Sequence, residues 1–279
     1  MTVRIVTDST CDLPAEDIER YAITVVPLTV FFGEEALLDG IDVTPADFYA
    51  RMVAFKGLPR TSQPSVELFQ DAYRSLASGG VDIVSIHISS RLSGTLNAAS
   101  VAREVVKEDV HVDLIDSYNV SLGLGLIVLE AARAAQAGAS LPEVVAAARR
   151  AMDRVSVHVV VDTLEYLQKG GRIGRARSFL GSVLKVKPII RVEDGEVAPF
   201  ERVRTRARAI ERIFELASNM PRAREMFVGC GGDDSDARAL IERLRPHLPH
   251  TELRLGYLGP VVGVYTGPNA LGIAALERE

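Results

Sequence analysis

The stretch VDIVSIHISSRLSGTLNAASVAREVV (81–106) contains the pattern that decides the fold. Its first part, VDIVSIHIS (81–89), is a short apolar run rich in β-branched residues, which predicts a buried strand. Its last part, SGTLNAASVAREVV (93–106), predicts a helix that begins directly after a polar loop. A buried strand that passes through a short loop into a helix is the repeating unit of a parallel sheet covered by helices.

The same alternation continues on both sides of this stretch. The other elements expected in the first half are strands at 3–10, 23–32 and 111–117, and helices at 14–22, 44–55, 64–80 and, as a pair, across about 120–153. The helix at 44–55 has a capping-box start, with Thr44 followed three residues later by Asp47. We therefore expect an α/β domain, residues 1–154, with a mostly parallel, doubly wound sheet.

The second half repeats the structural class without repeating the sequence. A basic glycine loop at 166–178 is expected to lead into a helix, and KPIIRVEDGEVAPFERVRT (187–205) reads as a β-hairpin that turns at Asp194-Gly195. The other expected elements are strands at 155–163, 225–232 and 252–257 and helices at 206–219 and 234–248. Residues 155–279 are thus expected to form a second α/β domain with a mixed sheet.

Composition narrows the class of protein. The 279 residues carry a net charge of −5, which gives no electrostatic reason to expect a nucleic-acid partner. The most apolar long run, residues 121–136, contains Glu130 and Arg133 and falls short of the ~18–20 apolar residues that a membrane span needs, so stable membrane insertion is not expected. Two distant cysteines and a strand-like N-terminus favour a cytoplasmic location.

Four loops of the first half end in small polar residues. They are TDST (7–10), TSQPS (61–65), SSRLSGT (89–95) and DS (116–117). Ligands of doubly wound sheets gather at the carboxyl ends of the strands, where a helix beginning at SGT aims free N–H groups at the crevice. Hydroxyls together with N–H groups suit an oxyanion, although each of these Ser and Thr residues is equally suited to capping a helix.

Other kinds of site find little support in the sequence. The nucleophile-elbow, P-loop and dinucleotide-binding motifs are absent, and KGGRIG (169–174) has the composition of an anion loop but not the spacing. His87 lies inside an apolar strand, so burial is expected rather than catalysis. The acids Asp8, Asp12 and Asp116 could converge on one site or simply cap helices. Because no paired Cys or His residues have the spacing of a metal site, we expect no metal site and no cofactor.

Seven stretches in order resemble a known family. They are TDSTCDLP, TSQPS, SSRLSGT, DS, LEYLQKGGRIG, KPII and GPVVGVYTGPNALGI, and together they span residue 3 to about 274. In this order they resemble the DegV family of bacterial fatty-acid-binding proteins. The resemblance implies two α/β domains that hold a long-chain fatty acid and no catalysis by the chain itself. It further implies a role as the acyl-carrying subunit of a fatty acid kinase, whose separate ATP-binding subunit phosphorylates the carboxyl group.

The resemblance also implies roles for individual residues. The implied ligand-binding set is Thr61, Ser62, Ser93, Gly94, Thr95, Arg172, Tyr265 and Thr266, with Arg204 at the surface for the kinase subunit. Three positions depart from the family pattern: Gln168 replaces a frequent basic residue, Tyr265 a frequent His, and Asn269 a frequent Gly. The alternative from another functional class is a stand-alone acyl hydrolase or transferase.

Overall fold

The computed structural model describes residues 2–77, 80–181 and 186–279. Its strands are β1 Val3–Asp8, β2 Thr24–Val26, β3 Thr29–Phe32, β4 Glu35–Leu38, β5 Arg60–Ser62, β6 Asp82–His87, β7 His111–Asp116, β8 Val155–Val160, β9 Lys187–Glu193, β10 Glu196–Val203, β11 Ala223–Cys230, β12 Glu252–Tyr257 and β13 Leu271–Glu277. Its α-helices are α1 Ala15–Arg20, α2 Pro45–Ala54, α3 Val66–Leu76, α4 Thr95–Val106, α5 Leu122–Gln136, α6 Leu141–Met152, α7 Glu165–Lys169, α8 Arg206–Ser218, α9 Ser235–Leu244 and α10 Pro260–Thr266. Short 3₁₀ helices form at η1 Ser9–Cys11 and η2 Gly174–Phe179.

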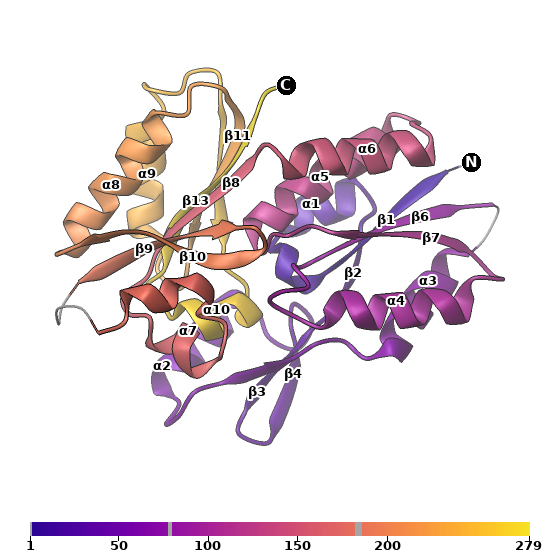
Figure 1. The fold of residues 1–279 in the computed structure, drawn as a ribbon, viewed down its shortest axis with the longest axis horizontal. Helices are drawn as coiled ribbons and strands as arrows, with labels where there is room; N and C mark the ends of the chain where they lie inside the picture. The colour runs from indigo at the N-terminus through magenta and orange to yellow at the C-terminus, as the bar shows by residue number, and fades with distance from the viewer. Residues whose placement is uncertain (1, 78–79, 182–185) are drawn as a thin grey trace.

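The first half builds the parallel sheet that its sequence predicts. The strand order is β2-β1-β6-β7, and all neighbouring pairs are parallel. Helices α3 and α4 cover one face, and α5 and α6 cover the other (Figure 1). Because both faces are covered, alternate residues of β1 enter different cores: Val6 packs toward α3 and α4, and Ile5 toward α5.

The second half builds a mixed sheet of six strands, which also agrees with the sequence. The order is β10-β9-β8-β13-β11-β12, and only β11 and β12 pair in parallel. The predicted hairpin is β9–β10, whose turn residues Asp194 and Gly195 have φ values of 52° and 78°. Helices α8 and α9 cover one face of this sheet (Figure 1), and α5 contacts β8 and β13.

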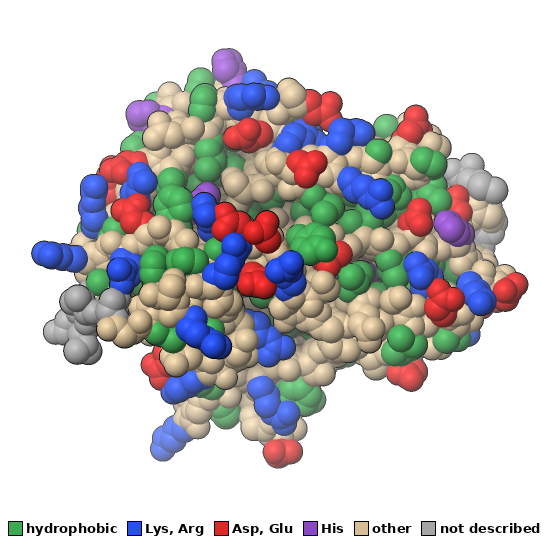
Figure 2. Space-filling model, in the orientation of Figure 1, with side chains coloured by type: hydrophobic (Ala, Val, Ile, Leu, Met, Phe, Trp, Pro, Cys, Tyr) green, Lys and Arg blue, Asp and Glu red, His purple; other side chains and the backbone are tan. Residues whose placement is uncertain are grey.

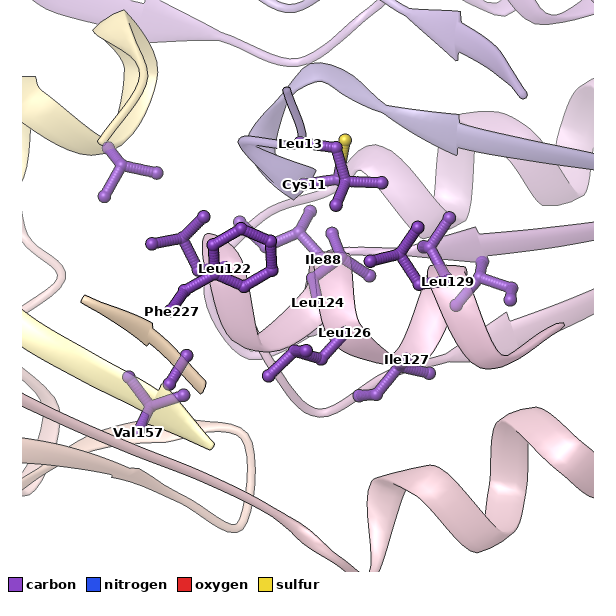
Figure 3. Packing of buried hydrophobic residues seen from close by; sticks show 14 of the residues in the cluster. Cys11, Leu13, Ile88, Leu122, Leu124, Leu126, Ile127, Leu129, Val157 and Phe227 are labelled. Atoms are coloured by element: carbon purple, nitrogen blue, oxygen red, sulfur yellow. The ribbon is translucent and has the colours of Figure 1, made fainter. Parts of the chain in front are cut away.

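One apolar cluster joins the two halves. Leu122, at the start of α5, lies among Val157 of β8 and Phe227 of β11, while Leu126 and Leu129 continue toward the first sheet (Figure 3). Gly229 and Gly256 make room for Leu122, because a Cβ at either position would come within 2.7 Å of its side chain. The division into domains 1–154 and 155–279 stays a prediction, since this core crosses residue 154.

Buried ion pairs reinforce the same junction. Glu225 of β11 is 1% exposed, and its carboxylate accepts hydrogen bonds from Arg133 of α5 at 2.7 Å and from Arg254 of β12 at 3.0 Å. Arg254 also pairs with Asp17 of α1. A buried carboxylate tolerates loss of water only when charged donors replace it, so this network ties the two halves in one arrangement. On the outer face drawn in Figure 2, basic and acidic side chains are interspersed.

The expectation of one strand over residues 23–32 is wrong. Pro27 has no N–H to donate and interrupts the run, so β2 joins the parallel sheet while β3 joins a separate antiparallel sheet of order β4-β3-β5. Thr61 and Ser62 therefore belong to β5 of this small sheet rather than to a loop after a parallel strand. This sheet packs with α2 and α10 in a further apolar cluster.

Other local expectations have mixed outcomes. Thr44 caps α2 as expected, with its Oγ1 accepting from Asp47 N at 3.2 Å, and the Asp47 carboxylate accepts from the Thr44 hydroxyl at 2.6 Å rather than from its backbone N–H. The glycine stop expected at the end of 64–80 falls partly outside the described residues. The basic glycine loop is shorter than expected, because α7 and η2 occupy most of 165–179. Within the described residues, no helix combines the length and apolar character required to cross a membrane.

Candidate functional site

A cavity of about 1120 Å³, part of it open to solvent, lies where the loops of the first sheet meet the six-stranded sheet and α10. Its wall is mainly apolar, and it takes residues from both halves of the chain. The lining comprises Thr10, Leu28, Thr61, Gln63, Ile88, Leu92, Ser93, Gly94, Val120, Ser121, Leu122, Val157, Val159, Leu167, Arg172, Ile190, Arg191, Val192, Val197, Gly229, Leu258, Val261, Val262, Tyr265, Thr266, Gly272, Ile273 and Ala274. An apolar wall with a few polar groups is typical of a site for a small organic ligand.

Two pairs of hydroxyl groups meet at this cavity. Thr61 Oγ1 of β5 lies 2.6 Å from Tyr265 Oη of α10, and Ser93 Oγ lies 2.8 Å from Thr95 Oγ1 at the start of α4. Each pair has two hydroxyl hydrogens and uses one between its members, so one donor remains for another acceptor. The first turn of α4 adds N–H groups that have no partner inside the helix. These groups together can hold an oxyanion.

The segments that carry Thr61 and Ser93 lie in close contact. The side-chain amide of Gln63 occupies the space beside Gly94, and a Cβ at Gly94 would lie 2.0 Å from Gln63 Oε1. Residue 94 must therefore be glycine for the Gln63 side chain to lie in this position. Gln63 itself was not anticipated from the sequence, although it stands within the TSQPS stretch.

Arg172 and Gly170 fix the position of Tyr265. The Arg172 guanidinium donates to Leu92 O at 3.1 Å and to Gly170 O at 2.8 Å, and it lies over the Tyr265 ring at 5.3 Å. Gly170 faces the same ring, since a Cβ there would approach two of its carbons at 2.5 Å. Arg172 therefore links the glycine loop to the 89–93 loop and places its guanidinium beside the Tyr265 ring at the cavity.

The structure brings most of the predicted set together at the cavity. Thr61, Ser93, Gly94, Arg172, Tyr265 and Thr266 all line it. Thr266 Oγ1 donates to Val262 O at 3.2 Å within α10.

The remaining predicted residues lie outside the lining. Ser62 is exposed and donates to Gln63 O, and the fully buried Thr95 reaches the cavity only through Ser93. Arg204 is exposed between β10 and α8, away from the cavity lining.

The three acids expected either to converge or to cap have separate roles, and Asp8 is the one of them that caps a helix. Asp8 accepts from Thr10 N at the start of η1, and Asp116 accepts from Tyr118 N. Asp12 and Asp39 are buried near the start of α10. Burial raises the pKa of Asp12 well above its usual range and raises the pKa of Asp39 to about 7, against the opposing effect of a hydrogen bond from Ser9. The described residues contain no group of three metal-ligating side chains.

His87 is buried, as expected from its place in a strand. Its Nε2 lies 2.7 Å from Ser85 Oγ and its Nδ1 lies 3.0 Å from Asp8 Oδ2. This Ser-His-Asp arrangement resembles a hydrolytic triad in composition, yet Ser85, His87 and Asp8 are all 0% exposed and none of them lines the cavity. Ser85 Oγ also bonds Tyr73 Oη at 3.0 Å, so the chain of polar groups is satisfied inside the core.

Comparison with known proteins finds relatives along nearly the whole chain. A family model described as "Uncharacterised protein, DegV family" matches residues 2–278. A DegV domain-containing protein of Streptomyces coelicolor is 40% identical over 280 residues, with 99% of each chain covered.

Two solved structures superpose closely on the chain. DegV of Bacillus subtilis, described as a fatty acid binding protein, has a TM-score of 0.92 at 34% identity, with 100% of both chains covered. A protein of Eubacterium ventriosum described as binding stearic acid has a TM-score of 0.92 at 30% identity, with 99% of this chain and 98% of that chain covered. The chain is matched along nearly its whole length in sequence and in fold, and it belongs to the DegV family.

Proposed function

We propose that this protein binds a long-chain fatty acid, with the carboxylate at the Thr61 and Ser93 hydroxyls and the tail along the apolar wall of the cavity. The observation that carries the proposal is the pairing of spare hydroxyl donors with an apolar cavity between the two sheets. The stearic-acid-binding neighbour supports the class of ligand.

The tail supplies most of the expected affinity. Burying a methylene group contributes ~0.8 kcal/mol, so about 16 carbons contribute on the order of 12 kcal/mol before ordering costs are subtracted. A carboxylate accepting from hydroxyl groups adds less, because it gives up hydrogen bonds to water. The head group therefore sets the orientation of the acid, and the tail sets the strength of binding.

Single hydroxyl removals test the carboxylate position. We expect Thr61→Ala and Ser93→Ala each to weaken fatty acid binding by about 1.5–3 kcal/mol, the value of one hydrogen bond to a charged group. Ser62→Ala is the matched control, because Ser62 is exposed and lies outside the lining. Titration of the folded variants with a labelled fatty acid gives the affinities. Unchanged binding in both Thr61→Ala and Ser93→Ala would refute this position.

We further propose that the bound acid is presented to an ATP-binding kinase subunit, which forms an acyl phosphate. Neutral donors suit this role, since they hold the carboxylate without the permanent ion pair that would restrain an attacking oxygen.

Arg204 is our candidate for contact with that subunit, because it is exposed and no ion pair within the described part of the chain engages it. A surface charge acts mainly on encounter and docking. Arg204→Ala should slow acyl phosphate formation at limiting kinase while the fatty acid stays bound, whereas Arg150→Ala on α6 should not. Equal rates for Arg204→Ala and the parent across kinase concentrations would exclude this contact.

The alternative of a stand-alone acyl hydrolase or transferase is separated by the bound material. Organic extraction of purified protein followed by mass spectrometry should yield intact fatty acid. An empty protein that turns over acyl esters would favour the enzyme.

A further inference from the structure

Two hydroxyl groups interrupt an apolar part of the cavity wall. Thr10 of η1 and Ser121, directly before α5, line the cavity together with Leu28, Val120, Leu258 and Val261. Thr10 is 0% exposed and Ser121 is 7% exposed. A buried hydroxyl beside an acyl tail adds nothing to the binding of a plain methylene chain, so this part of the wall is more polar than such a chain requires.

Both hydroxyls are tied to buried carboxylates behind the wall. Thr10 Oγ1 donates to Asp8 Oδ1, and Ser121 Oγ donates to Asp12 Oδ2, each at 2.5 Å. A hydroxyl that donates to a carboxylate keeps its lone pairs for a partner on its other side. This part of the wall therefore accepts hydrogen bonds, in contrast to the donors that Thr61, Tyr265 and Ser93 supply.

The fold holds Ser121 in place at a cost in backbone strain. Ser121 has φ 59° and ψ −146°, a region that residues with a side chain rarely occupy. Close packing enforces this conformation, since a Cβ at Gly125 would lie 2.6 Å from Cys11 O and a Cβ at Gly123 would lie 2.2 Å from Asn119 Oδ1. The start of α5 is thus pressed against η1, which brings Ser121 to Asp12 and to the cavity.

We propose that Thr10 and Ser121 form a subsite for a hydroxyl group carried on the acyl chain, so that the ligand class includes hydroxylated long-chain fatty acids. This inference rests on the proposed function. A hydroxyl suits the subsite because it can donate to the free lone pairs of Thr10 and Ser121. It also fits if Asp12 carries a proton and Ser121 becomes a donor, because a hydroxyl accepts as well. The acid head group has its hydroxyl donors at the Thr61 and Ser93 end of the cavity, which leaves this part of the wall to the chain.

The test is a series of stearic acids that each carry one hydroxyl at a different chain position, titrated against the wild-type protein beside stearate. We expect one position, or two adjacent ones, to bind at least as tightly as stearate. Isomers that place the hydroxyl against the apolar wall should bind at least about tenfold more weakly. If stearate binds while every isomer is weaker by this factor, the subsite is wrong and the proposed function stands. If stearate itself does not bind, both are wrong.

Substitutions assign any preference to the subsite. Ser121→Ala keeps the Cβ and should weaken the preferred isomer about tenfold relative to stearate, with Thr10→Val acting in the same direction. Ser117→Ala is the matched control, because Ser117 is a buried serine of the same segment that does not line this cavity. A preference that survives both Ser121→Ala and Thr10→Val would overturn the assignment. The wild-type series keeps the test decisive even if a variant does not fold.

Discussion

Replacing Tyr265 by Phe isolates one hydroxyl at the proposed head-group site. The ring is kept, so its stacking under Arg172 at 5.3 Å and its packing against Gly170 should persist. The hydroxyl that lies 2.6 Å from Thr61 Oγ1 is lost, and with it one of the two hydrogens that the pair shares. Because the site is partly open to water, we expect a loss of about 1–2 kcal/mol, or roughly 5–30-fold in the Kd for stearate.

Calorimetric titration of stearate into the delipidated protein measures this loss. Tyr257→Phe is the matched control, since its hydroxyl bonds Asp234 at 2.6 Å on an exposed strand end outside the cavity. Thermal unfolding of both variants checks that the fold is kept. The reasoning fails if Tyr265→Phe binds as tightly as the parent, or if Tyr257→Phe loses as much affinity.

Three further predictions concern packing and titration. Gly170→Ala should displace the Tyr265 ring and weaken stearate binding at least as much as Tyr265→Phe. Denaturant titration should show a loss of about 1–3 kcal/mol in unfolding free energy. A variant that is fully stable and binds stearate tightly would contradict the contact. The folded pKa of Asp39, about 7, exceeds its unfolded value near 3.8, so the stability that this group contributes is lost as pH rises from about 4 to 7. Asp39→Asn should therefore flatten the dependence of unfolding free energy on pH in this range, whereas the exposed Asp71→Asn should not. Burial raises the pKa of Cys230 to about 12 and that of Cys11 further, so neither thiol should react with a water-soluble alkylating reagent at pH 8 until the protein is unfolded; labelling of the native protein would show otherwise.

Local sequence patterns predicted most of the fold, because strands, helices and turns depend mainly on residues that are close in sequence. The apolar runs at 3–8 and 82–87 form buried parallel strands, and the Asp194-Gly195 turn closes the expected hairpin. The small antiparallel sheet was not anticipated, because β5 is only three residues long and its pairing with β3 depends on register rather than on periodicity. Pro27 interrupts the run for a local reason, but the sequence does not show that the strands on its two sides join different sheets.

The candidate site was harder to predict because its contacts are distant in sequence. Thr61 and Tyr265 are 204 positions apart, and only the fold brings them together. Family resemblance singled out the hydroxyl loops, whereas nothing in NVSLGLG (119–125) signals the strained backbone of Ser121. Ser62 and Thr95 were assigned through the resemblance to the family, yet they lie outside the lining, one exposed and the other fully buried.

A crystal structure of the protein with stearate tests the central claim most directly. We expect one carboxylate oxygen within about 3.5 Å of Thr61 Oγ1 or Tyr265 Oη, the other within the same distance of Ser93 Oγ, and the tail running along Val157 and Val262. Electron density that places the carboxylate away from these hydroxyls, or the tail outside the cavity, would contradict the account.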